Sequence, residues 1–144
     1  MKRFRKSKAE SLNFTNVVTT IRDIGEIELL NRLKKFMRSG QIDDDIAVIK
    51  SINKNLLINT DLLVEKIHFS DKISNAQDIG WKCITTNVSD LICSGSENMI
   101  SFTVGLVLPP STNWKWVENL YEGMYEAMQE FGGEIIGGDC CSGE

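Results

Sequence analysis

Five aspartates fall at or near the ends of predicted helices and strands, where side chains from separate segments can meet at one rim. Asp44 and Asp45 precede a predicted strand, Asp61 follows the next one, Asp90 lies late on a predicted helix, and Asp139 ends the last predicted strand. Mg²⁺ prefers such oxygen ligands, and phosphoryl transfer mainly needs charge neutralisation and alignment. Acidic residues at turns also act as solvated side chains or caps. A metal-assisted phosphate site is therefore predicted if the five converge.

A glycine-rich segment leads into the last of these aspartates. Gly132-Gly133 is followed by a short apolar run and then by Gly137-Gly138-Asp139. Glycine lets the backbone approach a phosphate closely and adopt positive φ. The segment is not a Walker A motif, because no Lys-Ser/Thr follows it and a short strand intervenes. It predicts either a phosphate contact or an ordinary tight turn.

Aromatic and imidazole side chains offer further binding groups. His68 is the single histidine of the chain, and it stands beside Phe69 where the chain is expected to leave the sheet. It can donate to an anionic substrate, or it can be purely structural. Trp114, Trp116 and Tyr121 share a predicted helix. Aromatic residues at helical spacing usually pack in a core, with contact to a nucleotide base as the alternative.

The elements that must position these residues follow the order helix, two strands, helix, strand, helix, strand. We expect helices over 25–37, 76–93 and 114–131, and strands over 46–49, 56–58, 99–108 and 134–136. Asn75 and Asn113 are suitable caps for the second and third helices. This order predicts an α+β domain over residues 23–144, with a four-stranded, mainly antiparallel sheet covered by helices, after a loose basic arm over 1–22.

The composition excludes several classes of function. A formal net charge of -4 argues against a nucleic-acid-binding protein, although basic residues crowd the first ten positions. That basic start is a nucleic-acid arm, a targeting peptide or a solvated terminus; no apolar region of a secretory signal follows it. No apolar run approaches the ~20 residues that span a membrane. The four cysteines form no C-x-x-C pair, which favours reduced thiols in a cytoplasmic protein.

Several strings, taken together, resemble the thiamine-monophosphate kinase family, which belongs to a superfamily that includes aminoimidazole ribonucleotide synthetase. The resemblance runs from Gly25 to Asp139 and covers most of the chain. Its most specific strings are Asp44-Asp45-Ile46-Ala47-Val48, Thr60-Asp61-Leu62-Leu63-Val64-Glu65-Lys66-Ile67-His68-Phe69, Ile79-Gly80-Trp81-Lys82 and Asn87-Val88-Ser89-Asp90-Leu91. The piece from Thr60 to Phe69 separates this family best from its superfamily relatives.

The resemblance implies a role for each matching position. It implies magnesium ligands at Asp45, Asn59, Thr60, Asp61, Asp90 and Asp139. It implies that His68 contacts the thiamine phosphate and that Tyr121, Gly138 and Asp139 contact ATP. The implied reaction transfers the γ-phosphate of ATP to thiamine monophosphate, giving thiamine diphosphate and ADP, with Mg²⁺ as cofactor and no catalytic side chain assigned.

The resemblance also implies an assembly and a wider architecture. Members of the family are homodimers whose amino-terminal sheets pair into a barrel, and they carry a carboxy-terminal domain that this sequence does not contain. Some positions differ from the family pattern: Asp43 replaces a glycine, Asn59 replaces a serine, and Cys140-Cys141-Ser142 replaces Thr-Thr-Arg. The alternatives are a non-catalytic dimerising domain of the same fold and a superfamily relative with another phosphate acceptor.

Overall fold

The chain divides into two compact units, residues 1–39 and 40–144, and each is described by itself. A computed structural model describes residues 20–37 of the first unit and residues 46–143 of the second. The predicted metal ligand Asp45 lies outside the described residues, together with Asp43 and Asp44. Most of the predicted basic arm, residues 1–19, also lies outside them.

The described part of the first unit is a helix, α1 (Ile21–Leu33), that continues into a 3₁₀ turn, η1 (Lys34–Phe36). The carboxylate of Asp23 caps its start by accepting hydrogen bonds from the backbone N–H and the hydroxyl of Thr20, at 2.8 and 2.7 Å. The predicted helix that opens at Gly25 is confirmed as the second part of α1, because Gly25 is non-helical, with a φ of 71°, and kinks the element. The short first part, which begins at Ile21 after the cap, was not predicted.

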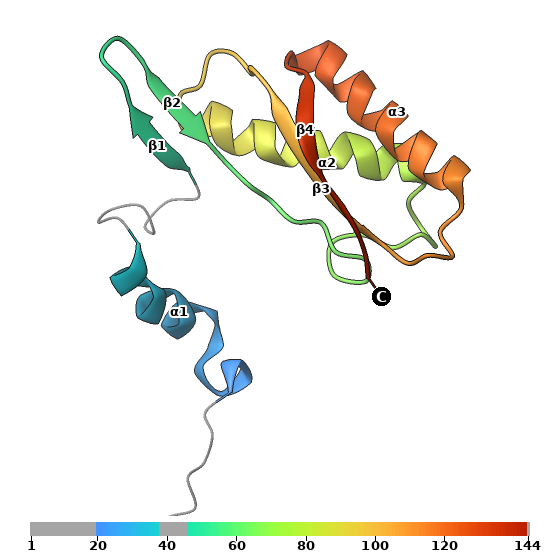
Figure 1. The fold of residues 1–144 in the computed structure, drawn as a ribbon, viewed down its shortest axis with the longest axis horizontal. Coiled ribbons are helices and arrows are strands. Elements are labelled where there is room, and N and C mark those ends of the chain that lie inside the picture. The colour runs from blue at the N-terminus through green and yellow to red at the C-terminus, as the bar shows by residue number, and fades with distance from the viewer. Residues whose placement is uncertain (1–19, 38–45, 144) are drawn as a thin grey trace, which may run out of the picture. The chain divides into compact units, whose positions relative to one another are not determined.

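The second unit is a hairpin followed by two helix–strand pairs (Figure 1). Its elements are β1 (Ala47–Lys50), β2 (Asn55–Ile58), α2 (Ala76–Cys93), β3 (Phe102–Leu108), α3 (Trp114–Phe131) and β4 (Ile135–Ser142). The cap side chains set the helix starts: Asn75 accepts from the backbone N–H of Asp78, and Asn113 accepts from that of Lys115, both at 2.8 Å. Both helices have the bounds expected from the sequence.

The four described strands of this unit pair as two separate two-stranded sheets, which corrects the prediction of one four-stranded, mainly antiparallel sheet. β1 and β2 form an antiparallel hairpin in which Ala47 lies opposite Ile58. β3 and β4 pair in parallel. The reason is topological: α3 carries the chain back to the starting end of β3, and a strand that follows such a crossover runs parallel to the first. The α+β class of the prediction holds.

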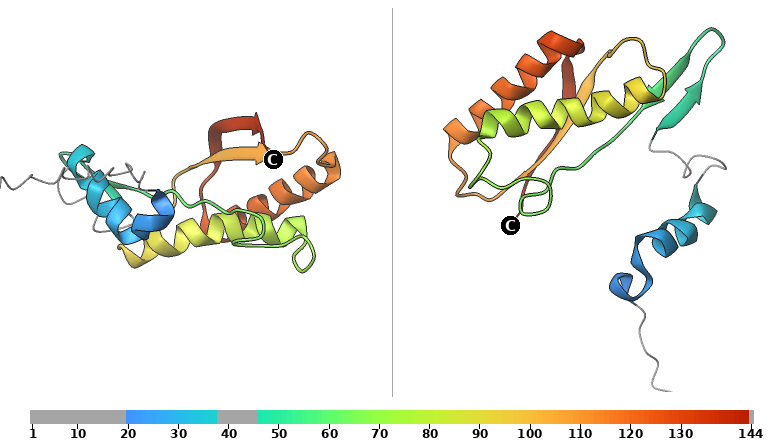
Figure 2. Two further views of the ribbon diagram at one scale, coloured as in Figure 1. Left: turned by 90° about the horizontal axis from the view of Figure 1, so that it is seen from below. Right: turned by 180° about the vertical axis from the view of Figure 1, so that it is seen from behind.

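The core lies between α2, α3 and one face of the β3–β4 pair. Both helices lie on the same side of these strands (Figure 2). Alternate residues of β3, including Phe102, Val104 and Leu106, pack against buried side chains of the helices. The two helix backbones meet closely, because a Cβ atom added to Gly80 would lie 1.9 Å from the carbonyl oxygen of Leu120. The spacing of the helices is therefore fixed by glycine.

Two further findings concern exposure and thiols. None of the helices in the described ranges has the length and apolar character needed to cross a membrane. All four cysteines fall in the described ranges and are free thiols, with Cys83 half-buried and the others exposed. Burial raises the pKa of the Cys83 thiol, and the nearby charge of Lys82 opposes that shift.

Candidate functional site

The loop that follows β2 carries three of the predicted metal ligands, and side chains of α2 hold it in place. The amide Nδ2 of Asn59 donates to Oδ2 of Asp90 at 3.0 Å. The backbone N–H of Asp61 donates to Oδ1 of Asn87 at 3.2 Å. Residues 59–64 form no regular helix or strand, so these side-chain bonds define where the loop lies. Asp90 and the loop from Asn59 to Asp61 are thus brought together.

Helical spacing explains how α2 makes both contacts. Asn87 and Asp90 are three residues apart on α2, so they lie on one face of the helix. Asn59 is itself fixed on both sides, because its Oδ1 accepts from the backbone N–H of Thr60 at 2.7 Å while its Nδ2 bonds to Asp90. The loop therefore offers oxygen atoms of neighbouring residues beside the carboxylate of Asp90.

His68 lies at the end of a tight turn, with one ring nitrogen already engaged. Its Nδ1 accepts a hydrogen bond from the backbone N–H of Val64 at 3.0 Å. The neutral ring therefore carries its proton on Nε2, which is the nitrogen left to donate to a ligand. The turn is closed by Lys66, which has a φ of 68° and donates its N–H to the carbonyl of Phe69 at 2.7 Å. Lys82 of α2 donates to the carbonyl of His68, also at 2.7 Å.

Gly138 and Asp139 lie inside β4 rather than after a short strand as predicted. Gly138 pairs with Val104 of β3, and Asp139 pairs with Gly105. Gly138 has a φ of 153°, and a Cβ atom there would lie 1.9 Å from the carbonyl oxygen of Val104. This position therefore requires glycine for close pairing of the strands. Asp139 is exposed.

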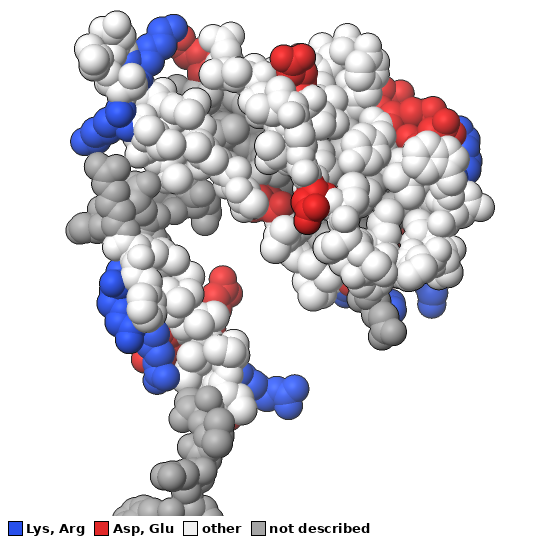
Figure 3. Space-filling model, in the orientation of Figure 1, with Lys and Arg blue, Asp and Glu red and all other residues white. Residues whose placement is uncertain are grey.

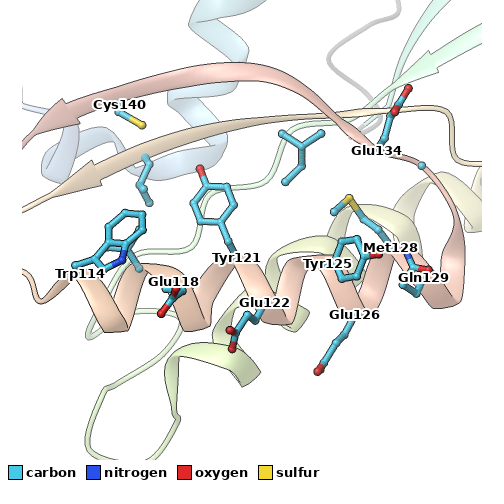
Figure 4. Close-up of a pocket in the computed structure, with 14 residues that line it drawn as sticks. Trp114, Glu118, Tyr121, Glu122, Tyr125, Glu126, Met128, Gln129, Glu134 and Cys140 are labelled. Atoms are coloured by element: carbon cyan, nitrogen blue, oxygen red, sulfur yellow. The ribbon is translucent and has the colours of Figure 1, made fainter.

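A groove of about 950 Å³ opens between α3 and the β3–β4 pair (Figure 4). Tyr121 projects from α3 towards the strands, and Cys140, which directly follows Asp139, lines the opposite wall. Trp114 and Tyr125 add further aromatic surface. Burial, and secondarily the Cys140 thiol, raises the pKa of the Tyr121 hydroxyl, which therefore remains a neutral donor at neutral pH. The groove suits a flat, largely apolar group.

The charge around the groove limits what it can hold. Acidic side chains gather over α3 (Figure 3), and Glu118, Glu122 and Glu126 all border the groove. Lys115 offsets this charge by pairing with Glu118 at 2.8 Å. A phosphate group would be repelled by this acidic border. A base or sugar fits the groove better than phosphates do.

The loop is suited to Mg²⁺ by the type of its donors. Asn59, Thr60, Asp61 and Asp90 all present oxygen, and no thiol or imidazole lies among them. Within residues 20–37 and 46–143, no three His, Cys, Asp or Glu side chains gather closely enough to hold a metal ion. The described residues thus supply part of a ligand set, and Mg²⁺ commonly completes its six positions with water and phosphate oxygens.

Some residues of this site had no assigned role in the sequence interpretation. Asn87 and Lys82 both lie in strings that mark the family resemblance, yet their contacts with the loops after β2 were not predicted. One signal was available, because asparagine is a poor residue for a helix interior and often has a side-chain role there. Trp114 was weighed as a base contact and does line the groove with Tyr121.

The second unit thus combines a loop with oxygen donors, held by side chains of α2, and an aromatic groove beside α3. The chain belongs to the family described as AIR synthase related protein, N-terminal domain, whose model matches residues 43–144.

Two thiamine-monophosphate kinases and one solved structure are similar to this chain over most of its length. A thiamine-monophosphate kinase of Prochlorococcus marinus is 54% identical over 129 residues, which cover 90% of this chain and 39% of that protein. The thiamine-monophosphate kinase of Aquifex aeolicus is 33% identical over 124 residues, 86% of this chain and 40% of that protein. The solved structure of AaThiL complexed with AMPPCP and TMP superposes with a TM-score of 0.80 at 31% identity, covering 89% of this chain and 41% of that one. The chain thus spans about two fifths of the length of the relatives it matches.

Proposed function

We propose that this chain forms the metal- and nucleotide-binding part of a thiamine-monophosphate kinase. The observation that carries the proposal is the tethering of the loop from Asn59 to Asp61 against Asp90, which gathers oxygen donors in one place. The naming of its relatives and the AMPPCP and TMP of the AaThiL complex support the choice of substrates. In this reaction an oxygen of the thiamine monophosphate attacks the γ-phosphorus of ATP, the bond to the β-phosphate oxygen breaks, and ADP leaves.

Each predicted residue receives a task in this proposal. Asp45, Asn59, Thr60, Asp61, Asp90 and Asp139 are the proposed Mg²⁺ ligands. Bound Mg²⁺ supplies positive charge that screens the repulsion between the two phosphate-bearing substrates. His68 donates through Nε2 to the phosphate of thiamine monophosphate, because its Nδ1 is already engaged by Val64.

The nucleotide takes the groove under this proposal. Tyr121 contacts the base or ribose, because the acidic border formed with Glu118 and Glu122 disfavours phosphates there. The phosphates then extend towards Gly138 and Asp139, which directly precede Cys140 in the groove wall. Because Gly138 has no side chain, the backbone of β4 can come close to these phosphates.

We also propose a homodimer in which the sheets pair with those of a second copy into a barrel. Apolar side chains of the hairpin and of β4 support this, since Ile52 is 99% exposed and Ile136 is 64% exposed. Analytical ultracentrifugation is expected to give twice the monomer mass. A monomer at micromolar concentration would contradict the dimer and leave the kinase proposal standing. The proposed location is the cytoplasm, where ATP is present and free thiols stay reduced.

Calorimetric titration with AMPPCP tests the proposed function. We expect binding by the unchanged chain in the presence of Mg²⁺, and loss of that binding after chelation with EDTA. Asp61→Asn keeps the size of the side chain but removes its charge, and it should weaken binding by roughly tenfold or more. Ser89→Ala, at an exposed position of α2, is the matched control. Equal binding with and without Mg²⁺, or no binding at all, would favour a non-catalytic dimerising domain.

A further inference from the structure

Asn87 occupies an unfavourable position for its residue type, and both ends of its side chain are used. It lies in the interior of α2, where asparagine is a weaker helix former than alanine. Its Nδ2 donates to the carbonyl of Cys83, one turn back, at 3.0 Å. Its Oδ1 accepts from the backbone N–H of Asp61 at 3.2 Å. The donor bond to Cys83 fixes which way the amide points, so the oxygen faces the loop.

We propose that Asn87 is a positioning residue that holds Asp61 in place for the divalent cation. The inference rests on the proposed function, in which Asp61 is a metal ligand. Asn87 does not itself bind the cation here; it acts through the backbone of Asp61, as outer residues commonly do around metal ligands. Hydrogen bonding at this backbone N–H restrains the carboxylate that the same residue carries.

The geometry of the loop gives Asn87 a different task from that of Asp90. Asp90 contacts Asn59, but both are proposed metal ligands, and their mutual bond engages Oδ2 of Asp90, an oxygen that the cation would also use. The bond from Asp61 to Asn87 uses a backbone N–H and an amide oxygen outside the proposed ligand set. It therefore persists when the cation is bound. Asn87 can hold the loop in the same position with and without metal, which reduces the ordering that binding requires.

A purely structural role makes different predictions, and two readouts separate them. If Asn87 only stabilised α2, replacing it by alanine would raise helix propensity and leave the loop unaffected. If Asn87 positions Asp61, the amide proton of Asp61 becomes more exposed to solvent and the affinity for a divalent cation falls. The first readout needs no metal and the second needs no catalysis.

The experiment compares Asn87→Ala, Asn87→Asp and the control Ser89→Ala in the full chain. NMR would measure amide exchange of Asp61 in the metal-free protein, and calorimetry would measure Mn²⁺ binding. For Asn87→Ala we expect Asp61 exchange to rise about two- to tenfold. We also expect Mn²⁺ affinity to fall roughly 10- to 100-fold. Asn87→Asp keeps an acceptor oxygen for the Asp61 N–H but loses the donor to the Cys83 carbonyl, so Asp61 exchange should rise less than in Asn87→Ala.

Either of two results for Asn87→Ala would overturn the positioning role of Asn87. Unchanged Asp61 exchange in Asn87→Ala, or unchanged Mn²⁺ affinity despite faster exchange, would overturn the positioning role. If Asn87→Ala fails to fold, Asn87→Asp decides the matter, since loss of Asp61 protection in that variant would equally overturn it. Absence of Mn²⁺ binding by the unchanged chain would refute the proposed function, while the exchange rates would still test the tether.

Discussion

The contact between α2 and α3 predicts that Gly123→Ala destabilises the second unit severely. A Cβ atom at Gly123 would lie 1.9 Å from the carbonyl oxygen of Gln77, 2.7 Å from its carbonyl carbon and 2.9 Å from its Cα. All three atoms belong to the backbone of α2, so no side-chain rotation relieves the clash. The helices would have to separate, and the buried side chains between them would lose contact.

The size of the effect follows from two opposing contributions. Overpacking of a tight core costs about 1–3 kcal/mol, and a clash with backbone belongs at the upper end of that range. Replacing a helical glycine by alanine returns up to about 1 kcal/mol through helix propensity. The net loss is about 2 kcal/mol. For a unit of this size, that loss lowers the melting temperature by roughly 8–16 °C.

Thermal melting followed by circular dichroism measures this shift, with Gly105→Ala as the matched control. Gly105 is also a glycine of the second unit, but it lies on β3 and has no heavy atom within 4 Å of an added Cβ. The control should melt within about 2 °C of the unchanged chain or slightly higher, because alanine loses less backbone entropy. A Gly123→Ala variant as stable as the control would refute the close helix contact and the site geometry built on it.

Three further predictions follow from the site. Gly138→Ala should disrupt the β3–β4 pairing, because its Cβ would overlap the Val104 carbonyl; near-unchanged AMPPCP affinity would argue against that. His68→Ala should weaken calorimetric binding of thiamine monophosphate roughly 10- to 100-fold, and equal affinity would remove the histidine from the site. Because burial raises the pKa values of Cys83 and Tyr121, the unfolded chain loses these protons first as the pH rises. Stability should therefore fall as the pH rises beyond their ordinary values of 9.0 and 10.0, and melting from pH 8 to 11 without a decline would contradict this.

Local signals explain why the two long helices could be predicted from the sequence. Asn75 and Asn113 mark the starts of α2 and α3, and in each case the cap bond joins residues two or three positions apart. Gly132 ends α3 with a φ of 87°, which also follows from residue type. Caps, apolar period and terminating glycine all lie within a few residues of the feature they set. Because these local signals agree, the bounds of both helices could be predicted from the sequence.

Strand pairing depends on contacts between distant residues and could not be predicted in the same way. The parallel register of β3 and β4 joins Phe102 to Ile135 across the whole of α3. The apolar pattern identifies a strand but does not name its neighbour. Glycines at 137 and 138 suggested that the last strand ended early. Instead, β4 continues to Ser142, and Gly138 can pair closely with β3 because it has no side chain.

The candidate site shows the same division. The aspartates could be selected by residue type and by resemblance, since oxygen donors define a Mg²⁺ site. The contact that holds Asp61 could not, because Asn87 lies 26 residues further along the chain. The tautomer of His68 likewise depends on a backbone N–H that only the folded turn brings to its ring. The residue types that could bind a cation or a phosphate were identifiable from the sequence, but the contacts that position them depend on the fold.

A crystal structure of the chain grown with Mn²⁺ and AMPPCP tests the central claim most directly. Mn²⁺ replaces Mg²⁺ and reveals its position by anomalous scattering. We predict a peak bonded to carboxylate oxygens of Asp61 and Asp90, at about the 2.1 Å typical of Mg²⁺–oxygen bonds, with the nucleotide base beside Tyr121. A nucleotide bound elsewhere, or a metal peak that touches neither aspartate, would contradict the account.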